Sequence, residues 1–255
     1  MIEAIDLAKR YGDVEALRGV TFRVEPGEIV GYLGPNGAGK STTVKLLTGL
    51  QPPTAGQARI AGCDVVADPI EAKRHIGLVP ESGAVYEALT PLEYLRLVGD
   101  LHELDPTHRD RRIHELMEFL GLEAPARNRQ MNGFSKGMKQ RVVIAAAILH
   151  DPEVILFDEP LSGLDVEGTV RVKQLISEAA ARGRAIFYCS HLLDVVERIC
   201  SRIVILAHGR IQLDGGLTEI LDRNPGSTLE QVFQARTGRR AERSHLDPTL
   251  HAERP

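Results

Sequence analysis

The pattern of apolar and polar positions predicts strands before about residue 87 and again after about residue 150, and helices between them. Near the start, apolar runs at 2–7, 20–24 and 28–33 are separated by glycine and proline, which is typical of strands joined by turns. The third run leads directly into a glycine-rich segment, and the residues from Lys40 to Leu47 then follow a helical pattern. Two more strands are predicted, at 58–60 and 75–79.

The middle of the chain carries apolar side chains at helical spacing. Residues 91–101 and 109–120 show this spacing, and Ser135 is the expected N-cap of a helix over 136–149. Because strands are predicted on both sides, we interpret residues 87–150 as a helical subdomain. It divides a core into a first part, 1–86, and a second part, 151–220.

Strands resume in the second part. The run Val154–Phe157 is continuously apolar, as expected for a strand that is buried on both faces. A helix at 166–181, a strand at 185–189, a helix at 192–199 and a strand at 203–206 then alternate. Such alternation predicts an α/β fold with a parallel sheet.

The last segment, 221–255, is expected to hold one short helix and a tail. Leu229, Val232 and Phe233 form an amphipathic pattern within 228–237, and this helix could pack on its own domain or contact a partner. From Thr237 onward there are few large apolar residues and many charges, so a mobile tail is predicted.

Composition narrows the class of protein. Of the 255 residues, 43% are hydrophobic and 26% are charged, which is ordinary for a soluble globular chain. The longest apolar run, 142–149, is far shorter than the roughly 20 residues of a membrane span. The start shows no secretory pattern, so an intracellular protein is expected. A net charge of −4 and the lack of Trp give no reason to expect a nucleic-acid partner.

One segment matches the phosphate-binding loop, Gly-x4-Gly-Lys-Ser, at Gly34-Pro35-Asn36-Gly37-Ala38-Gly39-Lys40-Ser41. Glycines let backbone N–H groups turn inward around a phosphate, and the following helix directs its positive end at the anion. Lys40 is expected to neutralise the phosphates and the Ser41 hydroxyl to ligate Mg²⁺. The position of the motif between a predicted strand and a helix strengthens this interpretation.

An acidic pair follows the buried strand at 154–157. Asp158 is suited to hold the shell of a magnesium ion. Glu159, next to it, could polarise an attacking water as a general base.

These motifs in this order resemble ATP-binding-cassette (ABC) ATPases, the nucleotide-binding subunits of transporters, over roughly residues 1 to 215. Beyond the phosphate loop, the resemblance rests on an aromatic residue, a signature segment, an interface loop and a switch histidine: Tyr11, Phe134-Ser135-Lys136-Gly137-Met138, Ser162-Gly163-Leu164-Asp165 and His191. It implies a P-loop (RecA-like) core with a parallel sheet, an N-terminal antiparallel β region and an inserted helical subdomain.

The resemblance also implies the site and its cofactors, ATP and Mg²⁺. Glu159, His191 and Lys40 would be catalytic, and Ser41, Asp158 and Glu81 would ligate the metal. The nucleotide would be bound by Tyr11, Gly34, Pro35, Asn36, Gly37, Ala38, Gly39, Lys40, Ser41, Thr42, Glu81, Ser135, Gly137 and Asp165.

Two departures from the family pattern stand out. Lys136 and Met138 replace the usual Gly and Gln of the signature, and Glu81 replaces a usual Gln. Glu can still ligate Mg²⁺, but it lacks the amide donor and adds charge. Both departures resemble exporter-type ATPases for drugs, antibiotics or lipids.

The resemblance implies two partners. A second ABC subunit, of the same or a related chain, would complete each ATP site, and a separate membrane permease would hold the protein at the cytoplasmic side of the membrane. One alternative is a soluble ABC ATPase that acts on ribosomes or DNA, although such relatives usually carry two cassettes or a long coiled coil. A second alternative is a regulatory nucleotide-binding module, which would be expected to lack Glu159 or His191.

Overall fold

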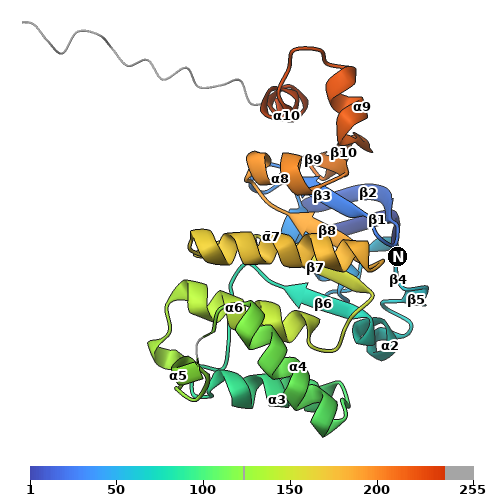
Figure 1. The fold of residues 1–255 in the computed structure, drawn as a ribbon. Helices are drawn as coiled ribbons and strands as arrows, with labels where there is room; N and C mark the ends of the chain where they lie inside the picture. The colour runs from blue at the N-terminus through green and yellow to red at the C-terminus, as the bar shows by residue number, and fades with distance from the viewer. Residues whose placement is uncertain (123, 239–255) are drawn as a thin grey trace, which may run out of the picture.

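A computed structural model describes residues 1–122 and 124–238, which form two sheets with helices around them (Figure 1). The first sheet is antiparallel and has the order β2-β1-β4-β5. Its strands are β1 (Ile2–Tyr11), β2 (Val14–Val24), β4 (Ala55–Ile60) and β5 (Cys63–Asp64).

The second sheet has the order β10-β9-β3-β8-β7-β6. Its first five strands in sequence are parallel, and β10 pairs antiparallel with β9 at one edge. The strands are β3 (Ile29–Leu33), β6 (Ile76–Val79), β7 (Val154–Asp158), β8 (Ala185–Cys189), β9 (Arg202–Ala207) and β10 (Arg210–Gly216). Every residue of β3, β7 and β8 is buried, which explains their continuous apolar runs.

Helices cover the second sheet and extend from it (Figure 1). On the side of the first sheet lie α1 (Lys40–Leu47) and α2 (Pro69–Arg74). A helical region follows β6 in sequence and comprises α3 (Pro91–Leu101), α4 (Pro106–Phe119), α5 (Ala124–Arg127), the short 3₁₀ turn Met131–Gly133 and α6 (Lys136–Ile148). The rest are α7 (Val166–Ala181), α8 (Leu193–Ile199), α9 (Leu217–Asp222) and α10 (Leu229–Thr237).

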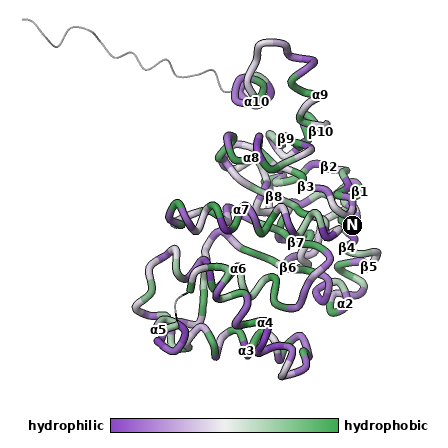
Figure 2. Tube along the Cα trace, viewed as in Figure 1, coloured by the Kyte–Doolittle hydropathy of each residue, from purple (hydrophilic) through white to green (hydrophobic). Residues whose placement is uncertain are grey.

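Two apolar cores hold these layers together. One lies between the two sheets, where the ring of Tyr32 contacts those of Phe22 and Phe187, with centroids 5.4 and 4.7 Å apart. The other lies between the opposite face of the parallel sheet and helices α3, α4, α6 and α7. Figure 2 shows hydrophobic stretches along the central strands and mixed hydropathy along the surrounding helices. The parallel sheet is therefore covered on both faces, as its sequence requires.

The fold class predicted from the sequence is confirmed, and most elements begin and end within a few residues of their predicted bounds. One helix is corrected: α4 begins at Pro106, not at 109, because the Asp105 side chain accepts the His108 N–H and caps it. The short elements β5, α2 and α9 and the edge strand β10 were not predicted, since six or fewer residues, or a half-exposed edge, show little periodicity. The predicted mobile tail starts at Thr237, which ends α10; residues 239–255 lie outside the described residues.

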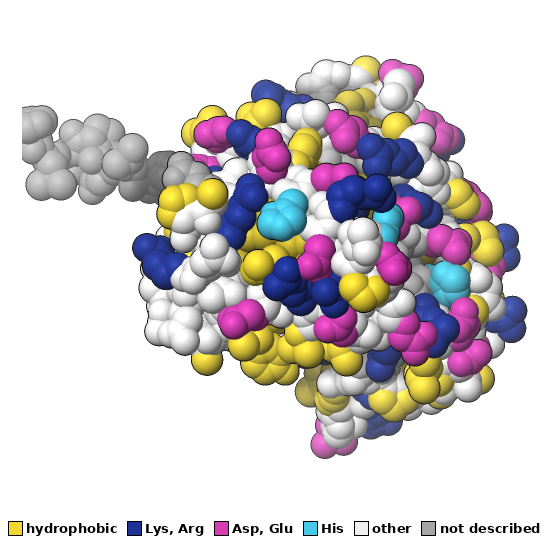
Figure 3. All heavy atoms as spheres, turned by 60° about the horizontal axis from the view of Figure 1, so that its bottom comes forward, with side chains coloured by type: hydrophobic (Ala, Val, Ile, Leu, Met, Phe, Trp, Pro, Cys, Tyr) yellow, Lys and Arg dark blue, Asp and Glu magenta, His cyan; other side chains and the backbone are white. Residues whose placement is uncertain are grey.

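The surface mixes charges of both signs. On the face seen in Figure 3, Lys and Arg side chains of the described residues alternate with Asp and Glu. None of the helices within 1–122 and 124–238 combines the length and the apolar character needed to cross a bilayer.

Candidate functional site

The strand order brings the candidate residues to one edge of the parallel sheet. Strands β3, β8 and β7 are neighbours, and β6 pairs with β7. The glycine-rich loop follows β3, Asp158 ends β7, Ser190 and His191 follow β8, and Glu81 follows β6. Because parallel strands end at the same edge, residues more than 150 positions apart in sequence meet there.

Close packing explains why glycine is needed at two positions of this loop. A Cβ on Gly34 would lie 2.5 Å from the carbonyl oxygen of Leu206. Gly39 has φ of 115°, and a Cβ there would lie 2.7 Å from the oxygen of Ala16. The loop therefore packs closely against β9 and the start of β2.

Helix α1 begins at the end of this loop and directs its N-terminus into the site. Its N-cap is Gly39, and no side chain of the described residues caps it. The helix is held against β3 by a hydrogen bond of 3.1 Å between the hydroxyls of Tyr32 and Thr43. Uncapped N–H groups and the helix dipole together favour an anion at this position.

Lys40 supplies the positive charge. Its ammonium donates to the carbonyl oxygens of Gly34, at 2.6 Å, and Pro35, at 3.3 Å. These contacts fold the lysine back over the loop. The Lys40 ammonium is therefore already positioned at the loop, where it could donate to an incoming phosphate in place of the carbonyl oxygens.

Asp158 is a buried carboxylate in a crowded acidic environment. Only 8% of the residue is exposed. Burial, followed by the charges of Glu81 and Glu159, raises the pKa of Asp158 to about 6, while Lys40 acts in the opposite direction. Three carboxylates thus lie near the ammonium groups of Lys40 and Lys45, both of which act against the rise in pKa, and the site has an excess of negative charge that a divalent cation would balance.

Glu159 occupies a strained backbone position. Its φ is 51°, in the left-handed region, and its N–H donates to the carbonyl oxygen of Cys189 at 3.0 Å. Strain of this kind costs about 1–3 kcal/mol and gathers at functional sites. The Glu159 carboxylate lies 2.8 Å from Nδ1 of His191 and accepts the Ser190 hydroxyl at 3.2 Å. The backbone and these two partners fix its direction.

These groups line one cavity of about 810 Å³. Of the residues predicted for the site, those that line it are Tyr11, Gly34, Pro35, Asn36, Gly37, Gly39, Lys40, Ser41, Thr42, Glu81, Asp158, Glu159 and His191. Four further lining residues were not predicted: Ala16, Ser190, Leu193 and Phe233. Ser190 was signalled by its place before His191, whereas no local pattern shows that α10 brings Phe233 to this cavity.

The comparisons with known proteins agree with this geometry. Residues 17–162 match the model of the ABC transporter family. The chain is 34% identical over 232 residues to the linearmycin resistance ATP-binding protein LnrL of Bacillus subtilis, covering 91% of this chain and 74% of that protein. The chain belongs to the ABC transporter family.

Solved structures of ABC cassettes have the same fold. An ATP-binding subunit of an ABC transporter superposes with a TM-score of 0.88 at 35% identity, covering 92% of this chain and 99% of the other. A dimeric cassette bound to ADP and Pi in a post-hydrolysis state gives 0.78 at 27% identity, covering 85% and 99%. The chain spans 60% and 62% of the length of uncharacterized relatives from Synechocystis sp. and Nostoc sp..

Four residues predicted for the nucleotide site do not line the cavity of the cassette. Ala38 is 3% exposed and packs in the core between the sheets. Ser135 caps α6, its hydroxyl accepting the Met138 N–H at 3.2 Å. Asp165 caps α7 and pairs with Arg141 at 2.6 Å. Gly137 lies against the carbonyl oxygen of Gly163.

The signature segment and the interface loop are joined within the chain. The Lys136 ammonium donates to the Ser162 hydroxyl at 2.7 Å, and its stem packs on Gly163. The unusual lysine is therefore directed at the interface loop of its own chain. The segment that carries Ser135 lies apart from the phosphate loop, on the N-terminus of another helix.

The donors present suit Mg²⁺. The Ser41 hydroxyl and the carboxylates of Asp158 and Glu81 are oxygen ligands, the kind that this ion prefers, and all three residues line the same cavity. Burial is the main cause of the raised pKa of Asp158, and repulsion by Glu81 and Glu159 adds to it; such an ion would relieve that repulsion.

Proposed function

We propose that this chain binds and hydrolyses ATP as a subunit of an ABC transporter. The observation that carries the proposal is the convergence of the phosphate loop, Lys40, the buried Asp158 and the strained Glu159 on one cavity. The match to the family model supports it.

Each group has a role that follows from its position. The loop N–H groups and the N-terminus of α1 would bind the β-phosphate, and Lys40 would bridge to the γ-phosphate. Tyr11, 41% exposed at the end of β1, offers a ring on which adenine could stack.

Ser41, Asp158 and Glu81 would hold Mg²⁺, which neutralises charge on the phosphates when bound. The ion would also hold Asp158 in its ionised form. Because Glu81 is a carboxylate where the family usually has an amide, the metal site of this chain carries one more negative charge.

Glu159 would accept a proton from the attacking water. The hydrogen bond that it accepts from Ser190 and its contact with His191 direct the carboxylate into the cavity. His191, whose side chain is 72% exposed, is free to swing toward the γ-phosphate once nucleotide binds.

A second copy, or a related subunit, would complete the site. The signature residues Ser135 and Gly137 lie outside the cavity of their own chain, so they can contribute only to the nucleotide of a partner. A two-fold axis would give two identical sites and a closed dimer. A dimeric cassette bound to ADP and Pi is among the structures that this fold matches.

The proposed partner of this dimer is a membrane permease, whose transport the dimer would drive. The helical region, with boundaries at about 87 and 150 as the sequence suggests, would receive the permease and transmit the closure of the dimer. Export is the proposed direction, because a relative of this chain is named for resistance to an antibiotic. The protein would then work at the cytoplasmic side of the membrane, held there by the permease.

Glu159→Gln tests the hydrolytic role. The variant keeps the shape of the side chain but loses the base, so steady-state ATPase activity should fall by about 100-fold or more while ATP still binds. Glu167→Gln, which changes an exposed carboxylate on α7, is the control and should keep the activity of the wild type. If Glu159→Gln hydrolyses ATP at the wild-type rate, Glu159 is not the base. Chelation of Mg²⁺ by EDTA should abolish the activity of the wild type.

A further inference from the structure

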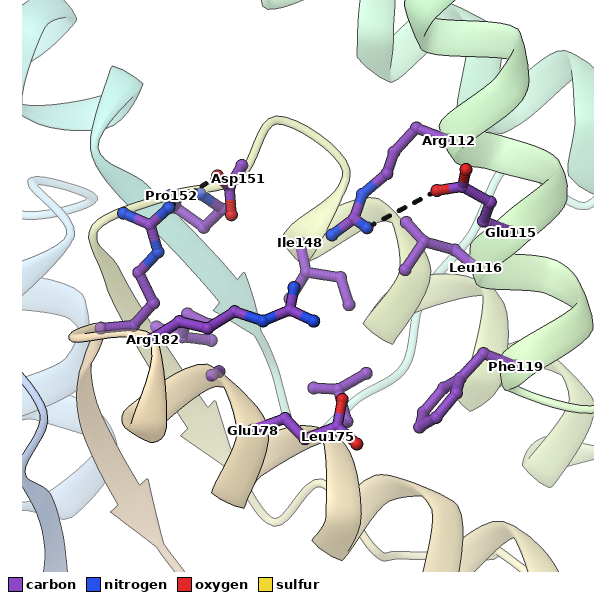
Figure 4. A pocket seen from close by; sticks show the side chains of 13 residues that line it. Arg112, Glu115, Leu116, Phe119, Ile148, Asp151, Pro152, Leu175, Glu178 and Arg182 are labelled. Carbon is purple, nitrogen blue, oxygen red and sulfur yellow. Dashed lines mark hydrogen bonds and ion pairs between the residues drawn. The ribbon is translucent and has the colours of Figure 1, made fainter.

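A second cavity lies at the other end of strand β7, between the helical region and the core. Its volume is about 240 Å³, and its walls come from α4, the end of α6, the start of β7 and α7 (Figure 4). No lining residue is shared with the nucleotide cavity. Ile155 of this cavity and Asp158 of the nucleotide site are three residues apart along β7, or about 10 Å. The two cavities are therefore separate sites.

The inner part of this cavity is apolar. Its deepest residues are 8% exposed or less and come from four different elements: Leu116, Ile148, Ile155 and Leu175. Phe119 of α4 adds a half-buried ring. Such a lining suits the hydrocarbon part of a ligand. The volume is below the roughly 300–1,000 Å³ of sites for drug-sized molecules, so only a small ligand would fit.

Two guanidinium groups stand over this apolar part. Arg112 reaches in from α4, and Arg182 reaches in from the end of α7 on the opposite wall (Figure 4). Arg112 has only a loose contact with Glu115, 3.8 Å between Nη1 and Oε2. Arg182 makes no ion pair within 4.0 Å among the described residues. Two like charges thus converge without a close ion pair, although Glu115 and Glu178 also line the cavity.

The third arginine of the cavity shows what full pairing looks like. The Arg184 guanidinium lies 2.6 Å from the Asp151 carboxylate, so this pair is part of the wall. Arg182 follows the last turn of α7, where the helix dipole favours a cation even without a ligand. That reason does not apply to Arg112, which lies in the middle of α4 and is only 25% exposed.

We propose that this cavity binds a small amphipathic anion, a carboxylate on an aromatic or short aliphatic body. The body would enter the apolar part, and Arg112 and Arg182 would hold the carboxylate, for which the guanidinium fork is well shaped. Glu115 and Glu178 also stand at this cavity. Their charges repel a dianion more than a monoanion, which favours a carboxylate over a phosphate.

The test uses hydrocinnamate as the probe, with binding to the full chain followed by chemical-shift titration in NMR. We expect a dissociation constant of about 1 mM, and shifts that centre on α4 and α7. Hydrocinnamyl alcohol, which has the same body without the charge, and inorganic phosphate, which has the charge without the body, should each bind at least about tenfold more weakly. Saturating ATP should leave hydrocinnamate binding unchanged.

Variants locate the site. Arg112→Gln and Arg182→Gln should each weaken hydrocinnamate binding by about tenfold, and Ala179→Leu, which fills part of the cavity, should abolish it. Arg111→Gln is the matched control: it lies beside Arg112 on α4, has a side chain 67% exposed, and does not line the cavity. Thermal unfolding of each variant shows whether it is folded.

Several results would overturn the proposal. Equal binding of the alcohol and the acid would leave only an apolar groove, and tighter binding of phosphate would mean that the apolar body is irrelevant. Displacement by ATP would place the probe in the nucleotide cavity. Folded Arg112→Gln and Arg182→Gln variants that bind like Arg111→Gln would remove the role of the guanidinium pair, and so would a wild type that shows no shifts at about 10 mM probe.

Discussion

The two edges of the parallel sheet differ in how well their charged side chains are paired. At the carboxyl edge, Glu81, Asp158 and Glu159 crowd around Lys40, and this crowding adds to burial in raising the pKa of Asp158 to about 6. At the amino edge, charged groups find partners in the chain, as Arg184 does with Asp151 at 2.6 Å. Two cations near that edge, Arg112 and Arg182, face the small cavity without a close partner among the described residues. Imbalance of charge therefore indicates where a ligand is expected, and balance indicates where charge serves the fold.

The largest effect should come from removing the cation of the carboxyl edge. Lys40→Met removes the larger of the two counter-charges that act on Asp158, and with it the ammonium that would bind phosphate. ATP affinity should fall by about 100-fold, because charged hydrogen bonds are lost, and hydrolysis should fall below detection. Fluorescent-nucleotide binding and a phosphate-release assay measure the two.

Lys45→Met is the matched control for this change. Lys45 lies on the same helix, is exposed, and does not line the cavity. Its substitution should leave ATP affinity within about twofold of the wild type. Should both variants lose affinity equally, the effect would come from α1 as a whole and not from a charge directed at phosphate.

The signature segment tests whether the carboxyl edge is sufficient on its own. Ser135→Asp keeps an N-cap side chain, so α6 should stay folded, but places a negative charge where a partner's γ-phosphate would lie. Steady-state hydrolysis should fall by about tenfold or more, with ATP affinity of the dilute chain unchanged. Thr228→Asp is the control: it also places an aspartate at a helix N-cap, that of α10, but away from the signature segment. Full activity of Ser135→Asp would mean that one chain hydrolyses ATP without a partner's signature.

The residues of the carboxyl edge could be picked out from the sequence because they lie in short continuous motifs. The phosphate loop and the acidic pair each combine a buried strand with the residues that follow it, so pattern and chemistry are adjacent in sequence. The arrival of Phe233 at the nucleotide cavity could not be predicted in this way, since it depends on where α10 packs. The same holds for the cavity of Arg112 and Arg182, whose residues are 70 positions apart and follow no motif.

Tyr11 offers a smaller test at the rim of the nucleotide cavity. Its ring is 41% exposed, and its hydroxyl donates to the Gln51 side chain. Tyr11→Leu should weaken ATP binding by about threefold to tenfold, since stacking of a base on an aromatic ring contributes roughly 1–3 kcal/mol when well buried and less at an exposed site. Tyr11→Phe keeps the ring and should bind nearly as well. A loss as large in Tyr11→Phe as in Tyr11→Leu would assign the effect to the hydroxyl.

The smallest effect should come from the amino edge, where the fold favours the neutral form of the His150 imidazole. Its ring stacks on that of His102, with centroids 3.6 Å apart, and its Nε2 is 3.0 Å from the carbonyl oxygen of Ile76. Burial, followed by the charge of His102, lowers the pKa of His150 from 6.5 to about 4. Burial and the charge of Arg74 also lower the pKa of His102.

The sign of the resulting pH dependence follows from proton binding. Between pH 6.5 and about 4, the unfolded chain binds a proton at position 150 that the folded chain does not. The free energy of unfolding should therefore fall as the pH drops through this window, and the contribution is full above pH 6.5. The difference in the free energy of unfolding between the two ends of the window should be about 1–2 kcal/mol, since partial exposure of the ring reduces the effect.

The variant His150→Gln tests this contribution. Its free energy of unfolding, measured with urea at both ends of the window, should depend less on pH by about that amount. His114→Gln, at an exposed position of α4, should retain the wild-type slope. An unchanged slope in His150→Gln would show that the amino edge tolerates a charge there, against the balance inferred from its ion pairs.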